Sequence, residues 1–264
     1  MKRVGAGLLV AGALLPLVPL LVWAISGQWR YPALVPQVFT SRGVRLVADP
    51  RTQALHGLAL STVIAVSVAV LACAIGLPAG RAIGLHRFRG RRLVQFLLLA
   101  PVIVPGLAVT LGIQVFFVRY GLAGTVTGVI LVQLMPAVAY AATVLSAAFA
   151  NFDVDYERQA RALGAGPIRT AIFVTVPLLR PAIIVAALFA FLISWSEYIL
   201  TLLVGGGQVQ TLPLLLFSAI GSADLTAAAG LGLLVVIPPL LLVGAASRRL
   251  AAPSATGVVG LGRL

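Results

Sequence analysis

Long runs of apolar residues without a charged side chain constrain most strongly what this chain can fold into. Residues 57–80, 124–148 and 225–246 contain no Asp, Glu, Lys or Arg. A helix needs about 20 apolar residues to cross roughly 30 Å of hydrocarbon, and each run is long enough. Because 61% of the 264 residues are hydrophobic and only 9% are charged, the sequence predicts an all-α, polytopic membrane protein.

The full pattern predicts one transmembrane domain, covering residues 1–264, with six membrane-spanning helices. Residues 4–25 also resemble a secretory signal peptide with a processing site, but an apolar run of 22 residues favours a retained span. Residues 26–56 are mixed polar and are expected to form an extended external loop. The apolar stretch 212–220 is too short to cross and indicates a re-entrant or interfacial segment. The expected spans are about 4–25, 57–80, 93–118, 124–148, 178–204 and 225–246.

Small residues and prolines mark two special places within these spans. Gly76, Gly80 and Gly84 lie four residues apart, which lets another helix approach closely. Pro101, Pro105 and Gly106 lie in the third span and predict a kink there.

The basic residues predict the orientation of the spans. With both termini cytoplasmic, 14 of the 19 Lys and Arg residues face inside and five face outside, as the positive-inside rule requires. The segment 81–92 alone holds five arginines, and between two spans it is best explained as an anchor at anionic lipid headgroups. The net charge of +13 is therefore attributed to topology, and nucleic acid is not expected as a partner.

Residues 151–177 form the one long polar interruption of the apolar sequence. The first twenty of them carry six of the 25 charged side chains. A charge at the centre of a membrane helix costs at least roughly 2.5–3.5 kcal/mol. The segment is therefore predicted to be a cytoplasmic loop.

This loop has the local pattern of helix, turn, helix. Asp153 or Asp155 can cap a first helix, and Gly164 can end it with a positive φ. Pro167 is placed to open a second helix, whose length Pro177 limits. One interpretation is a solvated loop in which Glu157 forms an i,i+4 ion pair with Arg161. The other is an amphipathic element that docks into a groove of a partner.

The loop resembles the signature loop of binding-protein-dependent ABC importer permeases, which reads Glu-Ala-Ala, three residues, Gly, nine residues, Ile-x-Leu-Pro. Ala160, Gly164 and Pro177 fit at the right separations, and valines at 174 and 176 replace Ile and Leu. Glu157 lies one place early.

The resemblance implies a type I importer permease whose segment 151–177 docks onto an ATPase. It further implies a dimeric cytoplasmic ATPase that holds ATP and magnesium, an extracytoplasmic solute-binding protein, and a second permease subunit, homologous rather than identical. The location implied is the bacterial inner membrane, with no cofactor bound by this chain. The residues implied in ATPase coupling are Glu157, Arg158, Gln159, Ala160, Arg161, Leu163, Gly164 and Pro177.

Two further motifs, at 101–106 (PVIVPG) and 194–207 (SWSEYILTLLVGGG), resemble permeases for polyamines, ferric iron and thiamine. The resemblance implies import of a small polar solute, with a polyamine or another cationic solute favoured. A sugar-type permease remains an alternative, although such permeases often place Asp before the glycine that corresponds to Gly164. An ATP-independent secondary transporter is a further alternative, but it would be expected to show more buried ionisable residues and an internal repeat.

Glu197 is the most informative ionisable residue within a span. It either reaches water at the membrane interface or lines the translocation pathway or its outer gate, since such groups usually face a cavity or a partner. Arg42 or Arg45 can neutralise it. Asp224 is interpreted as a helix cap rather than a solute contact. The pathway candidates are Ser194, Trp195, Glu197 and Tyr198.

The sequence contains no recognisable catalytic motif. Gly207 is followed by Gln208 where a phosphate-binding loop would have Lys. His56 and His86 are predicted on opposite sides of the membrane, so they cannot share a metal ion. The chain is therefore predicted to be no enzyme, with neither catalytic nor metal-binding residues.

Overall fold

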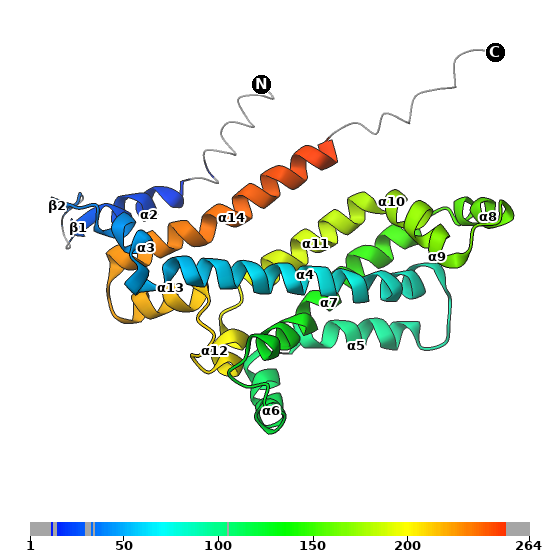
Figure 1. Cartoon of the computed structure of the whole chain (residues 1–264), viewed down its shortest axis with the longest axis horizontal. Coiled ribbons are helices and arrows are strands. Elements are labelled where there is room, and N and C mark those ends of the chain that lie inside the picture. Colours follow the sequence, from blue (N-terminus) through cyan, green and yellow to red (C-terminus); the bar gives the residue numbers. More distant parts are fainter. Residues whose placement is uncertain (1–11, 13–14, 30–32, 34, 105, 252–264) are drawn as a thin grey trace, which may run out of the picture.

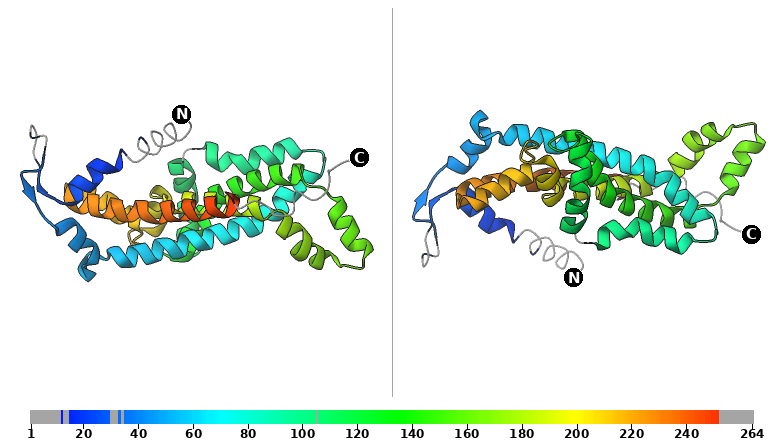
Figure 2. Two further views of the ribbon diagram at one scale, coloured as in Figure 1. Left: turned by 90° about the horizontal axis from the view of Figure 1, so that it is seen from above. Right: turned by 90° about the horizontal axis from the view of Figure 1, so that it is seen from below.

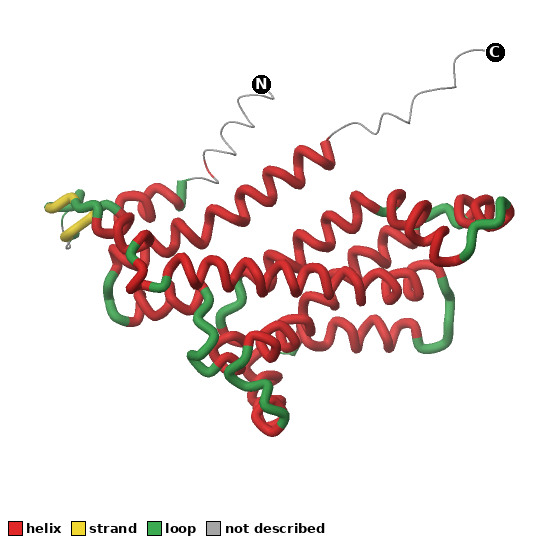
Figure 3. The backbone as a smooth tube through the Cα atoms, viewed as in Figure 1, coloured by secondary structure: helices red, strands yellow, loops and turns green. Residues whose placement is uncertain are grey.

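The computed structural model describes residues 12, 15–29, 33, 35–104 and 106–251. The described part is almost entirely helical (Figures 1 and 3). The polar segment α8 (Asp155–Ala162), α9 (Pro167–Thr170) and α10 (Val176–Leu178) lies at one end of the long axis. A short hairpin lies at the other end in all views (Figure 2).

Three long helices form the core: α4 (Ala54–Leu85), α7 (Val126–Ala150) and α11 (Arg180–Trp195). The predicted track of small residues on α4 packs against α7. A Cβ atom added at Gly80 would lie 2.8 Å from the Cβ of Leu145, and one at Gly84 only 2.6 Å from the Cβ of Phe149. The prediction of a close helix approach is confirmed, because no larger residue fits there.

Three helices are long and apolar enough to cross a membrane: α4, α7 and α14 (Leu225–Ala251). A fourth candidate is a bent pair in which residues 167–178 meet α11 at 78°. The first arm of this pair belongs to the polar segment. The first part of the expected first span lies largely outside the described residues, and its second part shows α2 (Leu17–Ala24) beside α14.

The expected span 93–118 is interrupted, because it consists of two helices. They are α5 (Arg91–Ile103) and α6 (Gly106–Arg119). Val104 is extended, with ψ 133°, as a residue before proline prefers. The predicted kink is thus a complete break, after which α6 turns away from α5 (Figure 1).

The expected span 178–204 is also interrupted. It consists of α11 and, after a break at residues 196–198, α12 (Ile199–Gly205). Residues 212–220 form the short helix α13 (Leu212–Gly221), whose ten residues extend only about 15 Å.

The expected extended loop 26–56 is partly helical. Strands β1 (Ser26–Gln28) and β2 (Val38–Phe39) pair antiparallel, and α3 (Arg42–Ala48) and the 3₁₀ turn η1 (Pro50–Thr52) follow. Arg42 pairs with Asp224 at 2.5 Å, and the Thr226 hydroxyl donates to the Ser26 carbonyl at 2.7 Å. These contacts attach the segment to the start of α14.

Candidate functional site

The polar segment folds as the predicted helix–turn–helix. The Asp153 carboxylate accepts a hydrogen bond from the Asp155 amide at 2.9 Å, at the start of α8. Gly164 has φ +87° and ends α8, and Pro167 occupies the first turn of α9. The second arm continues through a π-helical turn, η2 (Ala171–Thr175), into α10. Local sequence determines this shape, since each residue adopts its preferred backbone conformation.

Glu157 is buried at the base of α8, with 3% of its surface exposed. Its two carboxylate oxygens accept hydrogen bonds from the two terminal nitrogens of Arg81 at 2.5 and 2.6 Å. The Thr175 hydroxyl donates to the same carboxylate at 2.6 Å. The Arg81 guanidinium also lies 5.8 Å from the centre of the Phe149 ring. The Arg81–Glu157–Thr175 cluster thus joins α4, α8 and the second arm.

The hydrogen bonds from Arg81, followed by that from Thr175, overcome the effect of burial and lower the pKa of Glu157 to about 2. The carboxylate therefore stabilises the folded state above its ordinary pKa of 4.5, and this contribution is lost as the pH falls toward 2. At physiological pH the cluster remains fully ionised.

The hydrogen-bonded partner of Glu157 differs from the expected one. The i,i+4 spacing favoured Arg161, but the carboxylate binds Arg81, which is 76 residues away. Arg81 was interpreted from the sequence as one of several lipid anchors. Neither Arg81 nor Thr175 carries a local signal of this role, because only the tertiary fold brings them to Glu157.

The polar segment carries large apolar side chains that are exposed. Leu163 is 89% exposed, Ile168 73% and Phe173 74%. Arg158 forms an exposed ion pair with Asp155 at 2.8 Å. The remaining coupling candidates are partly or fully exposed: Gln159, Ala160, Arg161, Gly164 and Pro177.

We name Leu163, Ile168 and Phe173 the apolar docking face. Sequence reasoning found Leu163 but missed Ile168 and Phe173, which follow the turn. A loop that is polar by composition can therefore present an apolar surface to a partner.

The four pathway candidates divide into two groups. Ser194 and Trp195 are buried in the helix packing. The Ser194 hydroxyl donates to the Gln133 side-chain oxygen at 2.5 Å, and the Gln133 amide donates to Thr201 at 2.9 Å. The Trp195 indole N–H donates to the Val235 carbonyl at 2.9 Å. Both side chains thus have structural partners, and their role in a pathway stays a prediction.

Glu197 and Tyr198 lie at the break between α11 and α12 and are partly exposed. The Glu197 carboxylate accepts a hydrogen bond from the Leu200 amide at 2.9 Å and so caps α12. The Tyr198 ring stacks on Phe217 of α13 at 4.2 Å between centroids. Both rings line a hollow of about 270 Å³, to which Gln210 also contributes.

Arg42, one of two residues considered as a neutraliser of Glu197, pairs instead with Asp224. The Asp224 carboxylate also accepts a hydrogen bond from the Ala227 amide at 3.1 Å. The predicted role of Asp224 as a helix cap is confirmed.

Comparison with solved structures relates the fold to a known transporter. The fold is similar to a chain from the crystal structure of a bacterial ABC transporter involved in the import of the acidic polysaccharide alginate. The TM-score is 0.69 at 18% identity, with 94% of each chain covered. At this identity the likeness supports the fold alone, which is that of a type I ABC importer permease.

Curated proteins provide closer relatives. The chain is 30% identical over 257 residues to the molybdenum transport system permease protein ModB of Mycobacterium tuberculosis, covering 90% of this chain and 91% of that one. It is 29% identical over 207 residues to a putative ABC transporter permease protein of Streptomyces antibioticus, covering 77% and 90%. It is 30% identical over 174 residues to the putrescine transport system permease protein PotI of Escherichia coli K12, covering 63% and 62%.

The family model described as "Binding-protein-dependent transport system inner membrane component" matches residues 76–254. This match includes the Arg81–Glu157–Thr175 cluster, the apolar docking face and the break between α11 and α12, and it covers more than half of the chain. The chain therefore belongs to this family and is an inner-membrane permease subunit of a binding-protein-dependent ABC importer.

Proposed function

We propose that the α8–α10 segment docks this permease onto a dimeric cytoplasmic ATPase and transmits its movement to the membrane helices. The observation that carries this proposal is the apolar docking face, since Leu163, Ile168 and Phe173 are exposed on the segment predicted to be a cytoplasmic loop. Exposed apolar side chains of this size on a rigid element favour insertion into a groove of a partner.

The Arg81–Glu157–Thr175 cluster supports the transmission of force. A docking helix attached only by a flexible loop would move without the bundle. Here α8 is joined to α4 by two charge-assisted hydrogen bonds, which are among the strongest side-chain contacts. In this proposal Glu157 acts as the inner attachment of the docking helix, while its neighbours contact the ATPase. ATP and magnesium are bound by the ATPase, and this chain performs no catalysis.

Disulfide-independent cross-linking tests the docking. In a Cys73→Ser background, Leu163→Cys or Ile168→Cys, labelled with the photoreactive reagent benzophenone-4-maleimide, is expected to cross-link on irradiation to the ATPase subunit that copurifies with this permease. Arg89→Cys is the matched control, because Arg89 is also an exposed residue of a predicted cytoplasmic loop. Cross-linking at Arg89 but not at the docking face would contradict the proposal.

We further propose that the solute is a small cation such as a polyamine, delivered by an external binding protein to a pathway shared with a homologous permease. Glu197 and the stacked rings of Tyr198 and Phe217 support this, because a carboxylate and aromatic faces both attract ammonium groups. The names of the relatives include putrescine, molybdenum and 2-aminoethylphosphonate transport.

Calorimetry on the external solute-binding protein that serves this permease tests the solute class. Putrescine or spermidine is expected to bind, and molybdate and 2-aminoethylphosphonate are not. Binding of an oxyanion or a sugar alone would overturn the proposed solute and leave the docking proposal intact.

A further inference from the structure

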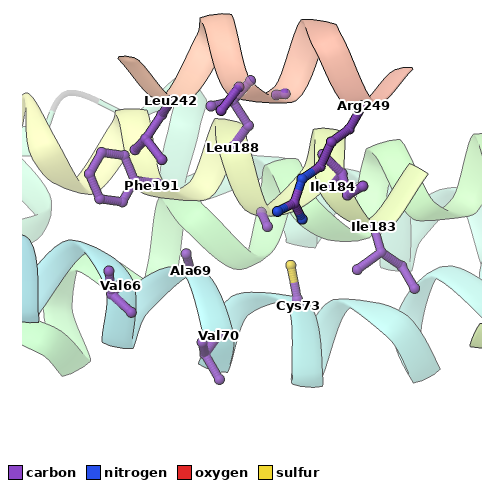
Figure 4. A pocket seen from close by; sticks show the side chains of 13 residues that line it. Val66, Ala69, Val70, Cys73, Ile183, Ile184, Leu188, Phe191, Leu242 and Arg249 are labelled. Carbon is purple, nitrogen blue, oxygen red and sulfur yellow. The ribbon is translucent and has the colours of Figure 1, made fainter. Parts of the chain in front are cut away.

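A hollow of about 570 Å³ lies between α4, α11 and α14 (Figure 4). Its walls are apolar, with Val66 and Cys73 contributed by α4 and Ile184 and Phe191 by α11. Among the described residues that line it, Arg249 of α14 is the only charged one. The hollow is therefore an apolar groove with a single cation.

The cation lies at one end of the groove. In Figure 4 the Arg249 guanidinium lies beside Ile184, whereas Phe191 and Val66 lie at the opposite end of the groove. Ile184 and Phe191 are seven positions apart on α11, which corresponds to about 10 Å. Since α14 ends near Arg249, the positive-inside orientation places this guanidinium at the cytoplasmic surface and Phe191 deeper in the membrane.

No acidic side chain of the described residues forms an ion pair with Arg249. All six acidic residues belong to the described part, and none of them forms an ion pair or hydrogen bond with Arg249. Three of them bind other arginines, in the pairs Arg42–Asp224, Arg81–Glu157 and Arg158–Asp155. Because Arg249 is also exposed, its guanidinium is accessible to an anion from another molecule.

We propose that this groove binds one anionic phospholipid of the cytoplasmic leaflet. The lipid phosphate binds the Arg249 guanidinium, whose planar donors suit a phosphate, and an acyl chain lies along the apolar walls toward Phe191. Basic pockets between membrane helices on the cytoplasmic side are typical sites of lipid headgroups. A polar solute is a poor occupant, because the walls offer it almost no hydrogen-bonding partners. The inference does not depend on the proposed solute.

Native mass spectrometry of the full-length permease, purified with its accompanying subunits, tests the proposal. Titration with phosphatidylglycerol is expected to show one tightly held lipid per chain. Arg249→Gln is expected to weaken this binding about five- to tenfold, as loss of one basic contact predicts. Arg248→Gln is the matched control, because it removes the same charge from a neighbouring residue that does not line the groove.

Three results would overturn the proposal. Equal weakening by both substitutions would indicate general surface attraction, and no weakening by either would exclude Arg249. Loss of a protein subunit from Arg249→Gln, with lipid binding unchanged, would show that a partner helix occupies the groove. Inorganic phosphate alone is expected not to compete, since it lacks the acyl chain.

Cys73, the single cysteine of the chain, provides a second measurement on unmutated protein. Its side chain lines the groove, so a bound acyl chain should shield it. Addition of phosphatidylglycerol is expected to slow alkylation of Cys73 by N-ethylmaleimide several-fold, and phosphatidylcholine is expected to have less effect. An alkylation rate that ignores both lipids would contradict the proposal.

Discussion

Glu157 shows how a single residue can have a role different from the one its position in a motif suggests. The carboxylate is buried, and it accepts hydrogen bonds from Arg81 and Thr175. A buried carboxylate without its cation is costly, whereas an apolar pair of similar size can be tolerated. The cluster should therefore respond very differently to single and to paired substitutions.

Arg81→Met is expected to destabilise the protein by about 1–3 kcal/mol, because it leaves the Glu157 carboxylate buried without its cation. Combined with Glu157→Gln, the loss should be smaller than the sum of the two single losses. Thermal unfolding of the detergent-solubilised permease measures both values. Removing the exposed Asp155–Arg158 pair is the control and should change stability by less than about 1 kcal/mol. Additive losses at Arg81 and Glu157 would argue against a direct coupling.

Gly164 combines positive φ with open space. A Cβ atom there would meet no heavy atom of the described residues within 4 Å, yet the φ of +87° is unfavourable for other residues. Gly164→Ala should therefore cost about 1–2 kcal/mol of backbone strain, changing the angle between α8 and α9 and lowering ATP-driven uptake. Gly166→Ala is the matched control, because Gly166 is equally open with φ −70°. Uptake assays that rank the two variants equally would refute the role of the turn.

At the scale of secondary-structure elements, the packing of α11 against α14 depends on a proline. Pro239 lacks an N–H group and cannot donate to the Val235 carbonyl one turn earlier. The Trp195 indole N–H donates a hydrogen bond to this carbonyl at 2.9 Å. A tryptophan expected to line the pathway therefore satisfies the backbone of a neighbouring helix.

Trp195→Phe is expected to cost about 1–3 kcal/mol, since it leaves the Val235 carbonyl without a donor as well as removing apolar contact. In a Pro239→Ala background the helix supplies its own N–H, and the cost of Trp195→Phe should fall by about 1 kcal/mol. Thermal unfolding of the four variants measures this coupling. An equal cost in both backgrounds would mean that the hydrogen bond contributes nothing.

Elements also show where sequence patterns are insufficient. Apolar runs identified α4, α7 and α14 correctly because each run forms one uninterrupted helix. The runs 93–118 and 178–204 are also mostly apolar, but each forms two helices. Hydropathy reports how favourably a segment enters lipid. It does not report whether the segment forms one continuous helix or two helices with a break between them.

At the scale of the whole molecule, the ends of the long axis have different characters. One end holds the polar α8–α10 segment and the other holds α3 and the β1–β2 hairpin (Figures 1 and 2). The distribution of arginines predicts that the first end is cytoplasmic.

Cysteine labelling in whole cells can check this orientation. In a Cys73→Ser background, Ser222→Cys lies exposed between α13 and α14 and should react with a membrane-impermeant maleimide. Arg158→Cys on α8 should react only after the membrane is permeabilised. The reverse pattern would invert the topology and remove the basis for docking on a cytoplasmic ATPase.

The sequence by itself determined the membrane class, the predicted orientation and the helix–turn–helix of the polar segment. These properties depend on local composition and on residues such as Gly164 and Pro167, whose backbone preferences act without distant partners. Only the tertiary structure decided that Glu157 binds Arg81, that Trp195 binds the Val235 carbonyl and that Arg249 faces an apolar groove. Each of these contacts joins helices far apart in sequence, and helix packing, rather than any local pattern, selects which side chains meet.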